Sequence, residues 1–415
     1  MRSICIVLHR YIGLATALFL VLLGLTGSVL AWREPLSAWL APELHHSPAR
    51  GAVLSLEQLA QHAHVADPAA QVILYPLSLQ SGDGVAVLVR ADGYDTLWLD
   101  PVSGSELGRT NSVSPWPTTR TLVDWLYHLH RQLAMPGRWG VWILGIVSLL
   151  WFFDCFIGAY LTLPPGRDVV RRWLPAWKVN RTRVNYDLHR AGGLWPWLLL
   201  AVMALSGVYF NLNEELFMPA LRTVATVTAD PFDVPVAADA AVESVAPAVA
   251  AVSVSQAATI AINHARTLGW SAAAEGAYHD VARKFWYVYF EKPESQWATA
   301  GGYSIFIDDR TGAITHVGTP GGTAGDVFLS WLGALHMGGV FGTPYKVVLC
   351  LLGVGVAMLS GTGVLIWWRK LCSRRAMRRR RAQVLASSVA AVAVLGPLAG
   401  LDFARPLIGA LQYVL

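Results

Sequence analysis

A short segment near the start of the chain returns 180 positions later, and each copy stands at the head of a long apolar run. Residues 8–14 read LHRYIGL and residues 188–194 read LHRAGGL, and gap-free coincidences continue to residue 36 of the first copy. Such self-similarity indicates a repeated structural unit, and each run is long enough to cross a bilayer as a helix. The repeat therefore predicts two membrane helices of one orientation that carry His9 and His189 at the same depth, with room for one cofactor between them.

The composition favours an integral membrane protein over a soluble multidomain enzyme, because 54% of the 415 residues are hydrophobic and only 14% are charged. The four cysteines lie in or beside apolar runs or the basic tail, so no disulfide framework is expected. The net charge of +5 comes from a few clusters of Lys and Arg, which bear on membrane topology and not on nucleic acid.

The alternation of apolar and polar stretches predicts an α-helical integral membrane protein with two small α+β extracytoplasmic domains. Membrane helix, outer domain and membrane helix follow one another twice, as an internal parallel repeat about an axis along the membrane normal. The expected segments are the first membrane helix 1–32, the first outer domain 33–119, an interfacial helix and second membrane helix 120–163, a basic loop 164–188, the third membrane helix 189–212, a linker and second outer domain 213–328, an interfacial segment and fourth membrane helix 329–368, a basic segment 369–383 and a hydrophobic tail 384–415. The first run is expected to be a retained anchor, since it is too long for the apolar region of a typical signal peptide.

Charge predicts the topology. Dense Lys and Arg clusters place the loop 164–188 and the segment 369–383 in the cytoplasm. The N-terminus is then cytoplasmic and both outer domains are periplasmic, in a multi-pass protein of the bacterial inner membrane. The cluster from Arg374 to Arg381 is interpreted as a topogenic stop that contacts anionic membrane lipid, with docking of an acidic electron donor as the alternative. The tail 384–415 is either a fifth span or an interfacial or re-entrant segment.

Each outer domain is expected to contain one helix followed by a small antiparallel sheet. Ser55 and Gln58 have the spacing of a helix capping box, and stretches rich in β-branched and aromatic residues follow. The expected helices are 55–63 and 255–267, and the expected strands are 72–77, 84–90, 94–99, 285–290 and 303–307. Each sheet includes a turn with the pattern Asp-x-x-(Ser/Thr)-Gly, at Asp100–Gly104 and at Asp308–Gly312.

Four histidines form two candidate pairs. His9 and His189, the inner pair, begin helices on the cytoplasmic side, and His130 and His336, the outer pair, precede helices on the other side. Imidazole nitrogens are common axial ligands of haem iron, so two bis-His haems would make an electron path across the membrane. Two His without Cys, Asp or Glu at ligand spacing suit zinc poorly. The alternative is that all four are polar residues of the membrane interface; His128 is a rival of His130, although it has no repeat partner.

Small residues leave a second question open. His9, Gly13 and Ala17 share one helix face, and Gly24 and Gly27 flatten the same helix further on. A groove of this kind accommodates either a porphyrin or a closely packed helix.

Charged residues near the histidines also have two interpretations. Arg follows the His at Arg10, Arg131 and Arg190, which suits haem propionates and is also common at a membrane interface. Asp154 lies inside the second apolar run. It either handles protons near the inner haem or a quinol, or pairs with a nearby Arg or Trp.

These motifs resemble those of the PepSY-associated transmembrane family, over about residues 5–370. The pattern appears as His9-Arg10-x-x-Gly13-Leu14, His130-Arg131-x-Leu133, Leu188-His189 with Gly193-Leu194-Trp195, and Leu335-His336-x-Gly338 with Phe341-Gly342. Within the family the chain resembles the inner-membrane siderophore-iron reductases of the FoxB type. The resemblance implies PepSY-like outer domains, two bis-His b-type haems and an oxidoreductase activity that reduces ferric siderophores. The tail after residue 383 lies outside the pattern.

The partners follow from what the sequence lacks. No Gly-x-Gly-x-x-Gly stands between a strand and a helix, so no dinucleotide site is expected. Electrons would then come from quinol or a cytoplasmic flavoprotein and pass to a ferric siderophore. Trp125, Trp331 and Phe341 are interpreted as stacking walls for this acceptor or as interface anchors. The alternative function is a non-enzymatic PepSY membrane protein that inhibits or tethers a peptidase or partner complex.

Overall fold

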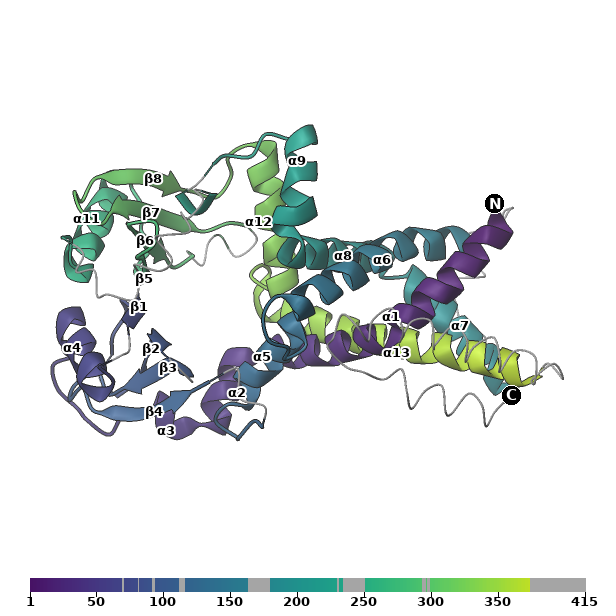
Figure 1. Cartoon of the computed structure of the whole chain (residues 1–415), viewed down its shortest axis with the longest axis horizontal. Helices are drawn as coiled ribbons and strands as arrows, with labels where there is room; N and C mark the ends of the chain where they lie inside the picture. The colour runs from purple at the N-terminus through teal and green to yellow at the C-terminus, as the bar shows by residue number, and fades with distance from the viewer. Residues whose placement is uncertain are drawn as a thin grey trace, which may run out of the picture.

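The computed structural model describes residues 1–68, 71–80, 82–91, 94–111, 116–162, 180–229, 231–233, 251–292, 296 and 299–373. An antiparallel sheet with two helices forms one end of an elongated molecule, and long helices form the other end, where the N-terminus lies (Figure 1). Most of the loop 164–188, the cluster Arg374–Arg381 and the tail 384–415 lie outside the described residues.

Among the described residues, three helices are long and apolar enough to cross a membrane: α1 (Arg2–Leu30), α6 (Trp139–Thr162) and α13 (Gly342–Ser373). A fourth candidate is the pair α7 (Arg181–Leu194) and α8 (Trp197–Asn211), which meet at an angle of 66°. The sequence predicted one run over 189–212. The bend falls at Pro196, which has no backbone N–H to continue the helical hydrogen bonds.

Two helices begin earlier than the sequence indicated. The prediction placed His9 and His189 at helix starts, but α1 begins at Arg2 and α7 at Arg181. Asn180 caps α7, because its side-chain oxygen accepts the amide of a residue in the first turn. Both histidines therefore lie about two turns inside their helices, with neighbouring helices around them.

Two glycines allow α1 and α13 to cross closely. A Cβ on Gly24 would collide with the Gly353 carbonyl, and one on Gly353 would collide with the Gly24 carbonyl. One turn along, the Ser28 hydroxyl donates to the Cys350 carbonyl at 3.0 Å. The buried apolar centre of the bundle consists of Leu20, Val147, Leu200, Leu352 and Val356. Gly24 is thus explained by helix packing.

One continuous sheet replaces the two that the sequence predicted. Its strands are β1 (Gln71–Pro76), β2 (Val85–Ala91), β3 (Tyr94–Leu99), β4 (Glu106–Thr110), β5 (Ala274–Asp280), β6 (Phe285–Phe290), β7 (Tyr303–Asp308) and β8 (Ile314–Gly318). Their order is β4-β3-β2-β1-β5-β6-β7-β8, with every neighbouring pair antiparallel. The two halves join where β1 pairs with β5, with Tyr75 opposite Ala277. Each of these is the first strand of its half, and their pairing satisfies edge groups that would otherwise be left open.

Two helices cover one face of the sheet, α4 (Leu56–Ala66) and α11 (Val254–Thr267). The expected capping box at Ser55 is confirmed, and Ser253 caps α11 in the same way. Glu57 on α4 accepts hydrogen bonds from the Ser255 amide at 3.1 Å and the Ser255 hydroxyl at 2.7 Å. Tyr75 of the first half is buried in the core of the second. The halves therefore share helix contacts and a core as well as a strand pair.

Both expected turns are confirmed. In each, the carboxylate of the first residue, Asp100 or Asp308, accepts the backbone amides two and three residues further on. Gly104 and Gly312 complete the turns with φ of +72° and +73°, in the left-handed region that favours glycine.

Short helices link the sheet to the bundle (Figure 1). They are α2 (Arg33–Leu40), α3 (Pro42–His45), α5 (Leu122–Gln132), the π-helix η2 (Asn213–Phe217), α9 (Met218–Val224), the 3-10 turn η3 (Pro231–Asp233) and α12 (Ala324–Met337). Two of them, α5 and α12, carry His130 and His336 and lie between the sheet and the long helices.

Candidate functional site

The inner pair lies toward the end of the bundle away from the sheet. His9 on α1 and His189 on α7 have ring centres 6.1 Å apart, with the ring planes inclined by 55°. His9 Nδ1 donates to Asp154 Oδ1 on α6 at 2.9 Å. His189 Nδ1 donates to the Leu359 carbonyl at 3.0 Å and lies 3.1 Å from the Thr362 hydroxyl, both on α13. Four helices therefore hold the two rings in place.

The outer pair lies beneath the sheet. The ring centres of His130 and His336 are 6.4 Å apart and the planes are inclined by 60°. His130 Nδ1 lies 2.8 Å from the Thr26 hydroxyl on α1, and His336 Nδ1 lies 2.6 Å from the Ser206 hydroxyl on α8. Burial lowers the pKa of His130 and of His336 to about 4. Both rings are therefore neutral at pH 7, as metal ligation requires.

The partners determine which ring nitrogen carries the proton. A carboxylate and a carbonyl only accept, so the inner rings donate from Nδ1. The Thr26 hydroxyl donates to the Leu22 carbonyl at 2.7 Å and the Ser206 hydroxyl donates to the Met203 carbonyl at 2.9 Å, so each accepts from its histidine. In the neutral form all four rings carry the proton on Nδ1 and the lone pair on Nε2. Metal-ligating histidines are held in this way, with the second nitrogen donating to a fixed acceptor.

The ring separations match one metal ion between two imidazoles. Metal–nitrogen bonds of about 2 Å place the centres of trans imidazoles roughly 6.3 Å apart, and the two pairs show 6.1 and 6.4 Å. In the part of the chain that the structure describes, no group of three or more His, Cys, Asp or Glu side chains could hold a metal ion. Two imidazoles alone suit haem iron, since the porphyrin supplies the other four ligands. The residues present therefore fit two bis-His haems.

Three of the histidines lie against glycines of another helix. These are His130 beside Gly27, His9 beside Gly158 and His189 beside Gly363. A Cβ at any of these glycines would come within 3.0 to 3.4 Å of the ring Cε1, closer than an ordinary carbon–carbon contact of about 3.5 Å. Gly27 therefore makes room for an imidazole, in contrast to Gly24.

The structure shows the partners of the charged residues that lie near the histidines in the sequence. Asp154 is only 7% exposed, and its partner is the inner-pair histidine of α1, not the Arg or Trp offered by the sequence. Arg190 forms an ion pair with Asp187 at 3.2 Å. Arg10 and Arg131 have no carboxylate partner among the described residues. The guanidinium groups of these two arginines therefore suit pairing with a propionate.

The rival outer ligand is not paired with His336. The structure places His130 against it, whereas the His128 ring lies 3.4 Å from the Gln132 side chain.

Trp331 and Phe341 pack on each other with ring centres 6.0 Å apart, against the buried cluster of Ala300, Val340 and Tyr345.

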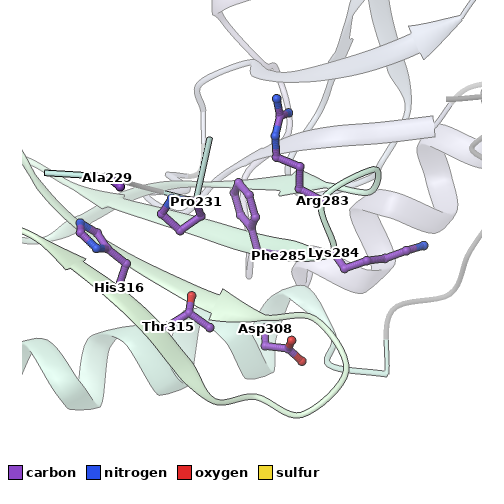
Figure 2. Close-up of a pocket in the computed structure, with 8 residues that line it drawn as sticks. All are labelled: Ala229, Pro231, Arg283, Lys284, Phe285, Asp308, Thr315 and His316. Carbon is purple, nitrogen blue, oxygen red and sulfur yellow. The ribbon is translucent and has the colours of Figure 1, made fainter. Parts of the chain in front are cut away.

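A cavity of about 1160 Å³ lies between β8, α9 and α12. Its walls include Tyr209, Arg222, Phe232, Arg283, His316 and Asp326. Figure 2 shows an adjoining pocket of about 370 Å³, which Arg283 and His316 also line. Trp125, Trp331 and Phe341 do not line the large cavity. No sequence motif marked it, because the wall residues come from segments far apart in the chain.

The aromatic residues at the cavity lead to the outer pair. The Phe210 ring meets the His336 ring edge-on, with centres 5.1 Å apart. Tyr209, which lines the cavity, lies 4.9 Å from Phe210 between ring centres. Aromatic contacts thus connect the cavity wall with a histidine of the outer pair.

Comparison with known proteins gives one result for almost the whole chain. The sequence model of the family named PepSY-associated TM region matches residues 6–370, a range that includes both histidine pairs and the whole sheet. No curated protein matches the chain. On this match, the chain belongs to the family of the PepSY-associated TM region.

Proposed function

We propose that this protein is a haem-containing reductase of the bacterial inner membrane that passes electrons to ferric siderophores in the periplasm. The observation that carries the proposal is that four histidines form two pairs, each ring held through Nδ1 with the Nε2 lone pair free. Haem held by these residues supplies reversible one-electron transfer. Electrons enter at the inner pair from quinol or from a cytoplasmic flavoprotein.

The spacing of the two pairs suits transfer across a membrane. His9 and Thr26, the residue that holds His130, are separated by 17 positions on α1, or about 25 Å along the helix axis. This is most of the roughly 30 Å thickness of the bilayer core. The basic loop after α6 and the basic segment after α13 favour a cytoplasmic location for the inner end, and the proposal accordingly assigns the sheet to the periplasm.

The cavity beside Tyr209 is the proposed site of the acceptor. A haem held by both His130 and His336 would have no ligand position left for the acceptor, so the acceptor would bind elsewhere. The cavity volume of about 1160 Å³ slightly exceeds that of most ligand pockets, which is about 300–1,000 Å³, as a bulky chelate requires. Siderophores bind Fe(III) through hard oxygen donors, so reduction to Fe(II) weakens the complex and releases iron. The chain Tyr209–Phe210–His336 gives the electron a short exit.

The test uses the purified full chain in detergent after expression with ample haem. Chemically reduced protein is mixed anaerobically with a ferric trihydroxamate siderophore, and reoxidation of the haem bands and Fe(II) trapped by a chelator are followed. We expect reoxidation coupled to Fe(II) release, and we expect His336→Ala to abolish both while the inner haem stays reducible. His128→Ala is the matched control and should behave like the wild type.

A colourless protein would reject the proposal and favour the non-enzymatic role in which the sheet binds a peptidase or a partner complex. Haem-loaded protein that ferric siderophore does not reoxidise would reject the acceptor alone.

A further inference from the structure

The two histidine pairs differ in the groups that accept their Nδ1 protons. At the inner pair the acceptors are the Asp154 carboxylate and the Leu359 carbonyl. At the outer pair they are the hydroxyls of Thr26 and Ser206. Among the described residues, no Asp or Glu hydrogen-bonds to either outer ring. The polarity of the acceptors therefore falls from a charged group at one end of the bundle to neutral hydroxyls at the other.

Asp154 is well placed to act through His9. Its carboxylate lies 2.9 Å from His9 Nδ1 and its side chain is 9% exposed, so solvent screens it weakly. Among the described residues no Lys or Arg pairs with it. Gly13 leaves space beside the carboxylate: a Cβ there would meet only Asp154 Oδ2, at 4.0 Å.

A carboxylate that accepts the Nδ1 proton makes the imidazole a stronger donor to a metal. A stronger donor and a nearby negative charge both favour the oxidised, more positive state of a ligated iron. A hydroxyl acceptor has neither effect to the same degree. Any iron at the inner pair is therefore harder to reduce than one at the outer pair.

We propose that Asp154 is a positioning residue that lowers the reduction potential of the inner site below that of the outer site, and so directs electrons from the cytoplasmic to the periplasmic face. The inference rests on the proposed function. In each transfer the inner site loses one electron and the outer site gains it. The donor, quinol or reduced flavin, gives up two electrons one at a time to the inner site and releases its protons to solvent, and two ferric siderophores each accept one electron from the outer site.

The test is an optical redox titration of the full chain in lipid nanodiscs. His336→Ala leaves only the inner haem and His189→Ala leaves only the outer one, so each potential is read separately. We expect the equilibrium constant for electron transfer from the inner to the outer site to be at least about 10. This corresponds to an inner potential at least 59 mV below the outer one, for one electron. Asp154 is unchanged in both of these proteins. If their potentials are equal, or if the inner potential is the higher one, the inference is overturned.

A second comparison isolates the carboxylate. Asp154→Asn, introduced into the His336→Ala protein, keeps an oxygen acceptor for His9 and removes the charge. We expect it to raise the inner potential by about 59 mV, which is a tenfold change in the one-electron equilibrium constant. A merely structural role would not change this potential. Asp67→Asn is the control, since Asp67 pairs with Arg109 beside the sheet. An unchanged inner potential in Asp154→Asn would also overturn the inference, whereas absence of haem from the wild type would instead reject the proposed function.

Discussion

Replacing Gly27 with valine should empty the outer haem site and leave the inner site filled. A Cβ on Gly27 would already lie 3.1 Å from His130 Cε1, and valine adds two more carbons whose rotamer is fixed in a helix. The ring must move, and its 2.8 Å hydrogen bond to Thr26 is lost. Overpacking costs about 1–3 kcal/mol and the lost hydrogen bond about 0.5–1.5 kcal/mol. A combined cost of about 1.5–4.5 kcal/mol weakens haem binding at this site roughly 10- to 2000-fold.

The assay is the ratio of haem to protein after purification, followed by titration of the empty site with haem. The matched control is Gly361→Val on α13, where an added Cβ meets nothing within 4 Å. We expect the Gly27 variant to keep one haem and the control to keep both. A Gly27→Val protein that binds both haems with the affinity of the wild type would refute the placement of His130.

Two further predictions concern the sheet and its link to the bundle. Glu57→Gln should lower the stability of the joined sheet by about 1–3 kcal/mol in thermal unfolding at pH 7, because the charged acceptor of Ser255 is lost. Burial acts to raise the pKa of Glu57, but hydrogen bonds, first that from the Ser255 hydroxyl and then those from the Glu57 and Ser255 amides and from Ser253, outweigh it and leave the pKa below its usual value of 4.5. Because the pKa of Glu57 is lowered in the folded state, its stabilisation is full above about pH 4.5 and is lost as the pH falls below that value. The stability deficit of Glu57→Gln should therefore vanish in acid. A deficit that persists at pH 3 contradicts this. Asp326→Ala removes the carboxylate that completes the capping box of α12 by accepting the Thr323 amide, and that also accepts the Thr228 amide. A cost of about 1–2 kcal/mol should weaken haem binding at the outer site, and equal loss at both sites would show that the capping box does not act through α12.

Much of the site was predictable because its signals are local or repeated. The pairing of His9 with His189 followed from one repeated segment, and that of His130 with His336 from a second. The turns at Asp100 and Asp308 were predictable because an Asp side chain and a Gly backbone determine them within five residues. Such features need no knowledge of what lies far away in the chain.

The remaining features depend on contacts between distant segments. Asp154 was visible as an acid in an apolar run, but its partner His9 is 145 residues away. The joining of β1 to β5 depends on a shared core that includes Tyr75, and neither strand signals it. Pro196 is a local signal for a helix break, but the apolar run continues on both sides of it, so one helix over 189–212 was predicted in place of two that meet at 66°.

Local spacing also left alternatives that only packing resolves. Gly24 and Gly27 lie on one helix and look equivalent in the sequence. The structure sets Gly24 against a backbone carbonyl of α13 and Gly27 against the ring of His130. His128 and His130 are likewise two positions apart, and only the placement of α12 separates them.

The central claim is that each histidine pair holds one haem, and the most direct measurement is haem per chain across four proteins purified in parallel. We expect two haems in the wild type with the spectrum of bis-imidazole coordination, one in His189→Ala, one in His336→Ala and none in the protein that carries both substitutions. Because His9 and Thr26, the residue that holds His130, are 17 positions apart on α1, loss at one site should leave the spectrum of the other unchanged. A wild type without haem, or a double variant that still binds two, would contradict the account.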